Sequence, residues 1–149
     1  MKFFVSLMLI SVLYGCSTLE TEQTDLYENY SQQAKAVKNN TILARRESFF
    51  TSEYLKEVDP DNEKSLLLLK LSQYIDQEIS HYQMLDNQKG CLSINGVELN
   101  KDPVSLHVEY KKEQGLWLVD YMFLHLIESR EDYVKKALCP REVENMIFK

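Results

Sequence analysis

The spacing of apolar residues changes near Gly90 from a helical period to an alternating one, and this change constrains the fold most. Before Gly90, apolar side chains recur at steps of three or four, which predicts an amphipathic helix over residues 63–89. Asp61 or Asn62 can cap its start, and Lys89 with Gly90 can end it. The apolar positions of this stretch are Leu68, Leu71, Ile75, Ile79, Tyr82 and Leu85.

Beyond Gly90 the sequence has the features of strands. Asn95-Gly96, within the segment SINGVEL, is a strong signal for a two-residue hairpin turn. Residues 104–111 alternate apolar and polar side chains and predict a half-buried strand, whereas residues 116–127 are apolar at both parities and predict a long central strand. Helices therefore precede strands along the chain, and this order predicts an α+β domain.

Three further helices are predicted from apolar spacing and capping residues. The first covers residues 25–38. A second is capped by Thr41. A third follows Ser129 as its cap, and Pro140 either ends it or begins a short piece that finishes at Phe148.

The order of the predicted elements resembles the nuclear-transport-factor-2-like (cystatin-like) superfamily. The residues that carry the resemblance are the predicted helix over 63–89, the segments SINGVEL and VSLHVEYKKEQGLWLVDY, and Trp117-Leu118-Val119-Asp120 after a glycine turn. The resemblance implies N-terminal helices packed on a curved antiparallel sheet that encloses a conical pocket, with a short C-terminal helical tail outside the common pattern. Members of the superfamily include isomerases, dehydratases and non-enzymatic binding modules.

The N-terminus has the layout of a secretory signal, because Lys2 precedes an apolar run over residues 3–14. This run is too short to cross a bilayer as a helix, which needs about 20 residues. Leu13-Tyr14-Gly15-Cys16 resembles the lipobox of bacterial lipoproteins, although Tyr14 is larger than the residue usual there. The resemblance implies cleavage before Cys16 and lipid on its sulfur, and an ordinary cleaved signal is the alternative.

A lipidated Cys16 would anchor the chain, since several acyl chains on one residue hold far more firmly than one. Ser17 in the next position resembles the default for sorting to the outer membrane, with the domain on the periplasmic face. The predicted organisation is a signal peptide over residues 1–15, a lipidated cysteine and flexible tether over 16–25, and a single α+β domain over 26–149.

Two cysteines remain besides Cys16, namely Cys91 and Cys139. In an oxidising periplasm this pair predicts one disulfide, and two unpaired buried thiols are the alternative. Neither cysteine has a second ligand at a regular spacing, and the chain has no paired-histidine motif, so we expect no metal site and no cofactor.

The charge balance limits the partners. The chain has 17 basic and 23 acidic residues, which argues against nucleic acid, because a phosphate backbone requires basic patches. The expected partners are the membrane, through the N-terminal lipid, and an envelope protein or an apolar small molecule.

Asp120 and His125 are weak candidates for catalysis. Asp120 lies in an apolar strand, where burial can raise the pKa of a carboxyl group. Tyr121 follows it, but neighbouring strand residues point to opposite faces, so we do not expect the two to share a pocket. The alternative role for Asp120 is a hydrogen bond at a strand bend, and we expect His107 and His81 to be exposed.

Four residues are candidates for a binding surface, because they share one parity of the last predicted strand and could line a pocket wall: Trp117, Tyr121, Phe123 and His125. Packing in the core is the alternative role for each. The predicted function is that of an envelope lipoprotein with a non-catalytic ligand- or protein-binding domain. The alternatives are an enzyme of isomerase or hydratase type and a scaffold subunit of an outer-membrane complex.

Overall fold

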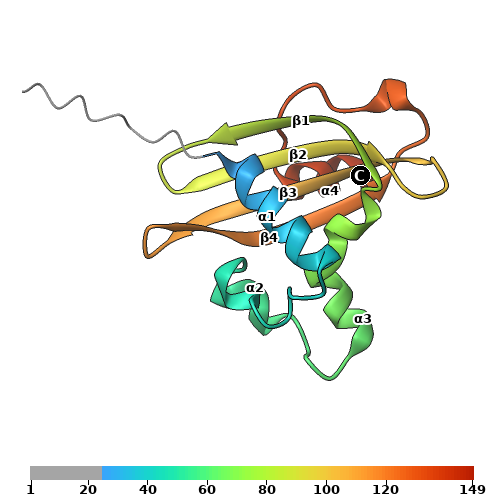
Figure 1. The fold of residues 1–149 in the computed structure, drawn as a ribbon. Helices are drawn as coiled ribbons and strands as arrows, with labels where there is room; N and C mark the ends of the chain where they lie inside the picture. Colours follow the sequence, from blue (N-terminus) through green and yellow to red (C-terminus); the bar gives the residue numbers. More distant parts are fainter. Residues whose placement is uncertain (1–24) are drawn as a thin grey trace, which may run out of the picture.

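The computed structural model describes residues 25–149, so that the predicted signal peptide, Cys16 and nearly all of the tether lie outside the described residues. The described chain forms a curved four-stranded antiparallel sheet in the order β1-β2-β3-β4, together with helices (Figure 1). The strands are β1 (Gln77–Leu85), β2 (Lys89–Val97), β3 (Pro103–Glu113) and β4 (Leu116–Leu126). The helices are α1 (Leu26–Lys38), α2 (Ser52–Lys56), α3 (Glu63–Leu66) and α4 (Pro140–Ile147), with the 3-10 helices η1 (Arg46–Ser48), η2 (Leu67–Tyr74) and η3 (Arg130–Asp132). These elements confirm the α+β class, and within residues 25–149 no helix is long and apolar enough to cross a membrane.

α1 confirms the helix predicted over residues 25–38. Asp25 is its N-cap, because the carboxylate of Asp25 accepts a hydrogen bond of 2.9 Å from the backbone N–H of Tyr27. The side chain of Gln83 on β1 accepts a second bond, of 3.0 Å, from the backbone N–H of Leu26. Two elements that lie far apart in the sequence are thus joined at the start of the helix.

The helix predicted over residues 63–89 is wrong beyond its first turns. α3 and η2 occupy its first half, with non-helical backbone angles at Lys70, and β1 occupies most of its second half. β1 pairs with β2 along its length, and this pairing satisfies the backbone polar groups that a helix would have satisfied internally. Gly90 does not end a helix but lies within β2, where a Cβ atom would stand 2.5 Å from Leu26 Cδ1 of α1. Tertiary pairing therefore outweighs the local apolar spacing.

The hairpin turn predicted at Asn95-Gly96 is also wrong, because both residues lie inside β2. The turn between β1 and β2 is at residues 86–88, where the Asp86 carboxylate accepts bonds from the backbone N–H groups of Gln88 and Lys89. Gly96 serves a close approach instead, since a Cβ atom there would lie 2.7 Å from the carbonyl oxygen of Gln77.

β3 confirms the strand predicted over residues 104–111, but both of its faces are buried, so the half-buried expectation is wrong. β4 confirms a strand over most of residues 116–127, yet it lies at an edge of the sheet and not at its centre. The turn between them contains Gln114 and Gly115, which both have positive φ angles, of 51° and 83°.

The shorter predicted helices are only partly correct. Thr41 does not cap a helix, and Thr51 is the cap instead, because its hydroxyl accepts a bond of 3.1 Å from the backbone N–H of Tyr54 at the start of α2. Ser129 caps only the single turn of η3, so the helix predicted after it is wrong. α4 confirms the short piece predicted to begin at Pro140.

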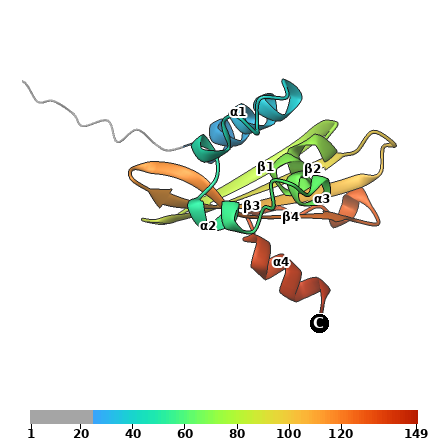
Figure 2. The ribbon, with the colours of Figure 1, turned by 90° about the horizontal axis from the view of Figure 1, so that it is seen from below.

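The two faces of the sheet differ in chemistry. α1 lies over one face and α4 lies on the other (Figure 2). Between α1 and the sheet is the main apolar core, which includes Leu26, Tyr30, Leu92, Ile94, Leu106, Val108 and Tyr110. The opposite face carries side chains that are polar and yet at most 7% exposed, namely Ser93, Asn95, Ser105, His107 and Glu109. The segment from η3 to Cys139 binds this polar face, for example through a bond of 2.8 Å from the Asn95 amide to the carbonyl oxygen of Val134.

Candidate functional site

A groove beside the edge strand β4 is lined by two of the site residues named from the sequence, Asp120 and Tyr121. Its volume is about 500 Å³, and α2, η2, β4 and α4 each contribute to its walls. This volume lies in the range of small-molecule sites, about 300–1,000 Å³. The lining residues are Glu53, Tyr54, Glu57, Leu68, Asp120, Tyr121, Met122 and Arg141.

A β-bulge places Asp120 in this groove. In the pairing of β3 with β4, Glu109 lies opposite Tyr121 and the next residue, Tyr110, lies opposite Val119, so Asp120 is the extra residue. A bulge changes the direction of side chains locally. As a result Asp120 and Tyr121, although consecutive, both line the groove, and the expectation that they could not share a pocket is wrong.

Thr51 fixes the orientation of Asp120. The Thr51 hydroxyl donates a bond of 2.8 Å to the Asp120 carboxylate, and Thr51 itself is fully buried. The backbone of Phe49 and Thr51 pairs with β4, because Val119 donates to the carbonyl oxygen of Phe49 and accepts from the N–H of Thr51. Asp120 is thus a rigid, half-buried carboxylate at a strand bulge.

Tyr121 forms the second anchored side of the groove. Its hydroxyl donates a bond of 2.7 Å to the Glu144 carboxylate of α4, and the guanidinium carbon of Arg141 lies 5.1 Å from the centre of its ring. Burial, followed by the hydrogen bond to Glu144, raises the pKa of Tyr121 to about 12, so the phenol is neutral at physiological pH. Tyr54 opposite is held by a bond of 3.0 Å from its hydroxyl to the carbonyl oxygen of Leu68, and burial raises its pKa further.

The four residues named as one binding surface are divided between the two faces of the sheet. Trp117 pairs with Lys112, whose ammonium lies 5.9 Å from the indole ring, and its ring packs against the apolar core. Phe123 and His125 lie on the opposite face, with ring centres 5.7 Å apart. The bulge at Asp120 shifts the alternation by one residue, which is why Trp117 does not share a face with Phe123.

His107 is buried and not exposed, contrary to the expectation from its strand parity. Its ring stacks on that of His125 at 5.6 Å, and its Nδ1 lies 2.9 Å from the Ser93 hydroxyl. Burial, and then the neighbouring His125, lowers the pKa of His107 to about 4, and burial lowers the pKa of His125 as well. Ser93 and His107 have no exposed surface, so this serine–histidine pair cannot reach a substrate in the described arrangement.

His81 also lies on a strand, β1, and not on the predicted helix. Its ring stacks on Tyr27 of α1 with ring centres 3.7 Å apart. Its Nδ1 lies 2.7 Å from a carboxylate oxygen of Glu78, and the side chain is 39% exposed. This cluster joins α1 to β1 at the surface.

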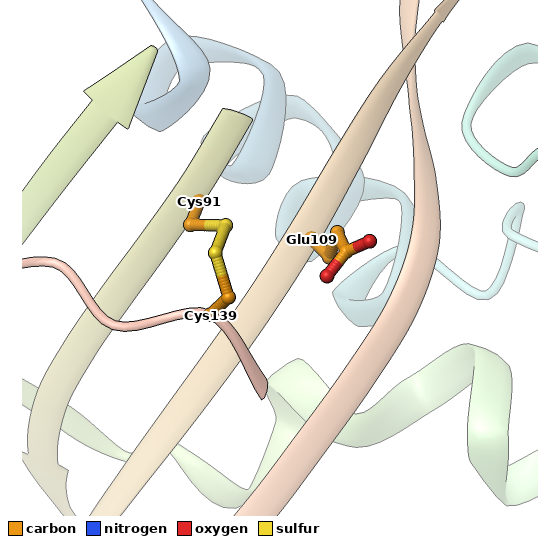
Figure 3. Close-up of side chains that lie close together, drawn as sticks. All are labelled: Cys91, Glu109 and Cys139. Carbon is orange, nitrogen blue, oxygen red and sulfur yellow. A yellow bond between two sulfur atoms is a disulfide. The ribbon is translucent and has the colours of Figure 1, made fainter. Parts of the chain in front are cut away.

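The disulfide predicted between Cys91 and Cys139 is present, with Cα atoms 5.1 Å apart. It joins β2 to the residue that precedes α4, and Glu109 of β3 lies beside it (Figure 3). Within residues 25–149, Cys91, Glu109 and Cys139 are the one group whose side chains could meet at a metal ion. Cys16 lies outside the described residues.

Several residues that line the groove or hold its lining side chains in place carry no signal in the sequence. Thr51, Arg141 and Glu144 reach Asp120 and Tyr121 only through contacts between distant parts of the chain. The bulge that brings Asp120 into the groove arises from strand pairing and has no local marker such as glycine.

Comparisons with known proteins add little. No protein-family model and no curated protein matches the chain. A solved chain, the designed protein Rd1NTF2_05 with five substitutions, is 15% identical with a TM-score of 0.36, and the match covers 68% of this chain and 100% of that chain. A similarity at this TM-score does not establish a shared fold.

Proposed function

We propose that the chain is a lipoprotein of the bacterial outer membrane, anchored through Cys16 and facing the periplasm, with a non-catalytic binding domain. The lipobox resemblance at residues 13–16 supports the anchor, and the polar tether supports a domain held away from the lipid. The Cys91–Cys139 disulfide is consistent with an oxidising compartment. For the fold we propose a cone of the nuclear-transport-factor-2-like kind, with α1 on the concave side of the sheet.

The groove at β4 is the proposed ligand site, and the main support for this proposal is the bulge at Asp120. The bulge places a fixed carboxylate beside the Tyr121 ring, above apolar surface from Leu68 and Met122. Three carboxylates and one guanidinium line the groove, and Lys56 pairs with one of the carboxylates, Glu53, at 2.9 Å, so one excess negative charge remains and favours a cation. Aromatic rings also attract cations through their faces. The ligand we propose is therefore an apolar molecule or peptide side chain that carries one positive charge.

Three probes of equal chain length test this proposal: octylamine, octanol and octanoate. They are titrated into the lipidated chain in detergent, and amide chemical shifts report the site. We expect octylamine to bind about tenfold more tightly than octanoate and to shift the amides of α2 and of residues 119–122. Equal affinities, or shifts confined to other elements, would contradict the proposed site.

Asp120→Asn is the matched variant for the same titration. It keeps the shape of the side chain and removes its charge, so the preference for octylamine over octanoate should fall while octanol binding stays unchanged. Asp76→Asn is the control, because Asp76 lies outside this groove and pairs with Lys101 at 3.1 Å. A loss of preference in the Asp76 variant, or none in the Asp120 variant, would point to general surface charge.

One observation favours the enzyme alternative as a second candidate. Because of the bulge, Asp120 and a neutral Tyr121 phenol line the same groove, and a carboxylate base with a phenol donor is the pair that isomerase or hydratase chemistry would use. Against this, Asp120 already accepts a hydrogen bond from the Thr51 hydroxyl, and the Tyr121 phenol already donates one to Glu144. Conversion of an enolisable ketone by the wild-type chain, lost in Asp120→Asn, would favour the enzyme.

A further inference from the structure

Besides forming the disulfide, Cys91 and Cys139 lie close enough to Glu109 for the three side chains to meet at one metal ion. Cys91 and Glu109 are direct partners across β2 and β3 and therefore point to the same face of the sheet. Cys139 reaches this face from the start of α4 (Figure 3). One ligand atom from each of the three side chains lies within 4.8 Å of the other two.

Glu109 is an unusual neighbour for a disulfide. It is only 7% exposed, and a buried carboxylate is costly unless cations or hydrogen bonds compensate it. The ammonium of Lys89 lies 2.9 Å from Glu109 Oε2, but no directed hydrogen bond reaches this oxygen from any described residue. A single cation thus compensates a buried carboxylate that faces two sulfur atoms.

Cys139 is the N-cap of α4, and the start of this helix sets its side chain beside Cys91. The thiolate is the form in which cysteine binds a metal. With 7% exposure, Cys139 is also the more accessible of the two cysteines, since Cys91 is fully buried.

We propose that the reduced chain binds one Zn²⁺ ion through Cys91, Cys139 and Glu109. A small-molecule dithiol reduces the disulfide by exchange, which converts it to two thiols while the dithiol becomes a cyclic disulfide. Zn²⁺ then displaces one proton from each thiol. Soft thiolates and a carboxylate are ligands that Zn²⁺ accepts, and water fills the fourth position.

The charges and the spacing agree with such a site. Two thiolates, the Glu109 carboxylate, the Lys89 ammonium and Zn²⁺ sum to zero net charge, which suits a buried site. Zinc–sulfur bonds of about 2.3 Å in a tetrahedron place the two sulfur atoms about 3.8 Å apart. Cα atoms 5.1 Å apart allow this separation through rotation of the cysteine side chains.

The metal would take over the role of the disulfide. The disulfide joins the segment before α4 to β2, and the metal would join it to both β2 and β3. Other hydrogen bonds between this segment and β2 do not involve the sulfur atoms. These bonds include the one of 2.9 Å from the Leu138 N–H to the Ser93 hydroxyl and the one from the Tyr133 hydroxyl to the carbonyl oxygen of Gly96. The same covering segment is therefore retained in the oxidised chain and in the zinc-bound reduced chain.

Titration of the full lipidated chain in detergent with Co²⁺, followed by displacement with Zn²⁺, tests the site. The protein is reduced, freed of reductant without air, and compared with the oxidised chain. We expect one equivalent of Co²⁺ with thiolate charge-transfer and tetrahedral absorption in the reduced chain, and none in the oxidised chain. An octahedral spectrum, or no binding by the reduced chain, would overturn the proposal.

Glu109→Gln separates the proposed site from simple binding to two thiols. It should weaken Zn²⁺ affinity of the reduced chain about tenfold or more, whereas Glu98→Gln, at a half-buried carboxylate in the β2–β3 turn, should leave it unchanged. Equal affinity of Glu109→Gln and wild type would overturn the role of the carboxylate. Because reduction could unfold the chain, Zn²⁺ should also raise the unfolding temperature of the reduced wild type, and no rise would equally contradict a site built by the fold.

Discussion

Replacing Cys91 and Cys139 by alanine is expected to release the C-terminal segment from the sheet. This segment is held to β2 by polar contacts such as that between Ser93 and Leu138. The main apolar core of the described residues includes no residue beyond Leu124, so burial of apolar surface in that core does not hold the segment in place. The disulfide is therefore a large part of its attachment.

The magnitude follows from the length of the closed loop. The two cysteines are 48 residues apart, and in the chain-entropy model a loop of this length corresponds to about 14 cal/mol/K, or about 4 kcal/mol at 25 °C. Native disulfides typically contribute about 2–4 kcal/mol. We therefore expect the free energy of unfolding of the double variant to decrease by an amount within that range. With a urea slope of about 2 kcal/mol/M, this loss lowers the unfolding midpoint by roughly 1–2 M.

Urea unfolding under non-reducing conditions, with amide hydrogen exchange on the same samples, measures this effect. Wild-type protein treated with a dithiol in the absence of metal is the control, and its midpoint should coincide with that of the double variant. The Leu138 amide should lose protection while the amides of α1 keep theirs. An unchanged midpoint, or equal loss of protection in α1 and at Leu138, would refute the reasoning.

Four further outcomes are expected. Gly96→Ala should lower the free energy of unfolding by about 1–3 kcal/mol in urea titrations, because its Cβ would lie 2.7 Å from a backbone oxygen, and a normal midpoint would contradict the close approach. Thr51→Val should cost about 1–2 kcal/mol in the same assay, since it removes a helix cap and the bond to Asp120. Burial lowers the pKa of His107 in the folded state to about 4, from an unfolded value near 6.5. As the pH falls, the unfolded state therefore binds the proton first, and the free energy of unfolding should decrease by up to about 3 kcal/mol between pH 6.5 and 4. His107→Gln should make the free energy of unfolding less dependent on pH in this range. Cys16→Ser should move the protein from membranes to the soluble periplasm in cell fractionation, and retention on membranes would contradict the lipid anchor.

The sequence predicted elements best where the local signals, such as capping residues and the spacing of apolar residues, indicate the same conformation. α1 has a cap and an apolar stripe that agree, and β3 has a clean alternation of apolar residues. Residues 77–85 instead match a helical spacing and still form a strand, because they pair with the neighbouring β2 on both sides of an irregularity between Glu78 and Ser80.

The candidate site was less predictable than the fold. Asp120 and Tyr121 could be named from the sequence, but alternation placed them on opposite sides of the strand. The register shift against Glu109 and Tyr110 reversed that conclusion, and the partners Thr51 and Glu144 come from segments that local patterns do not connect. Contacts of this kind depend on pairing between distant segments, for which a single sequence has no local signal.

By itself the sequence determined the α+β class and the positions of α1, β3 and β4 along the chain, because composition and apolar period act locally. It predicted the pairing of Cys91 with Cys139 with two unpaired thiols as the alternative, and the structure contains the disulfide. Only the tertiary structure decided that Asn95-Gly96 lies inside a strand and that His107 is buried beneath the C-terminal segment. The physical reason is that burial and strand register depend on which distant segment covers a residue, and that choice is made by the packing of the whole chain.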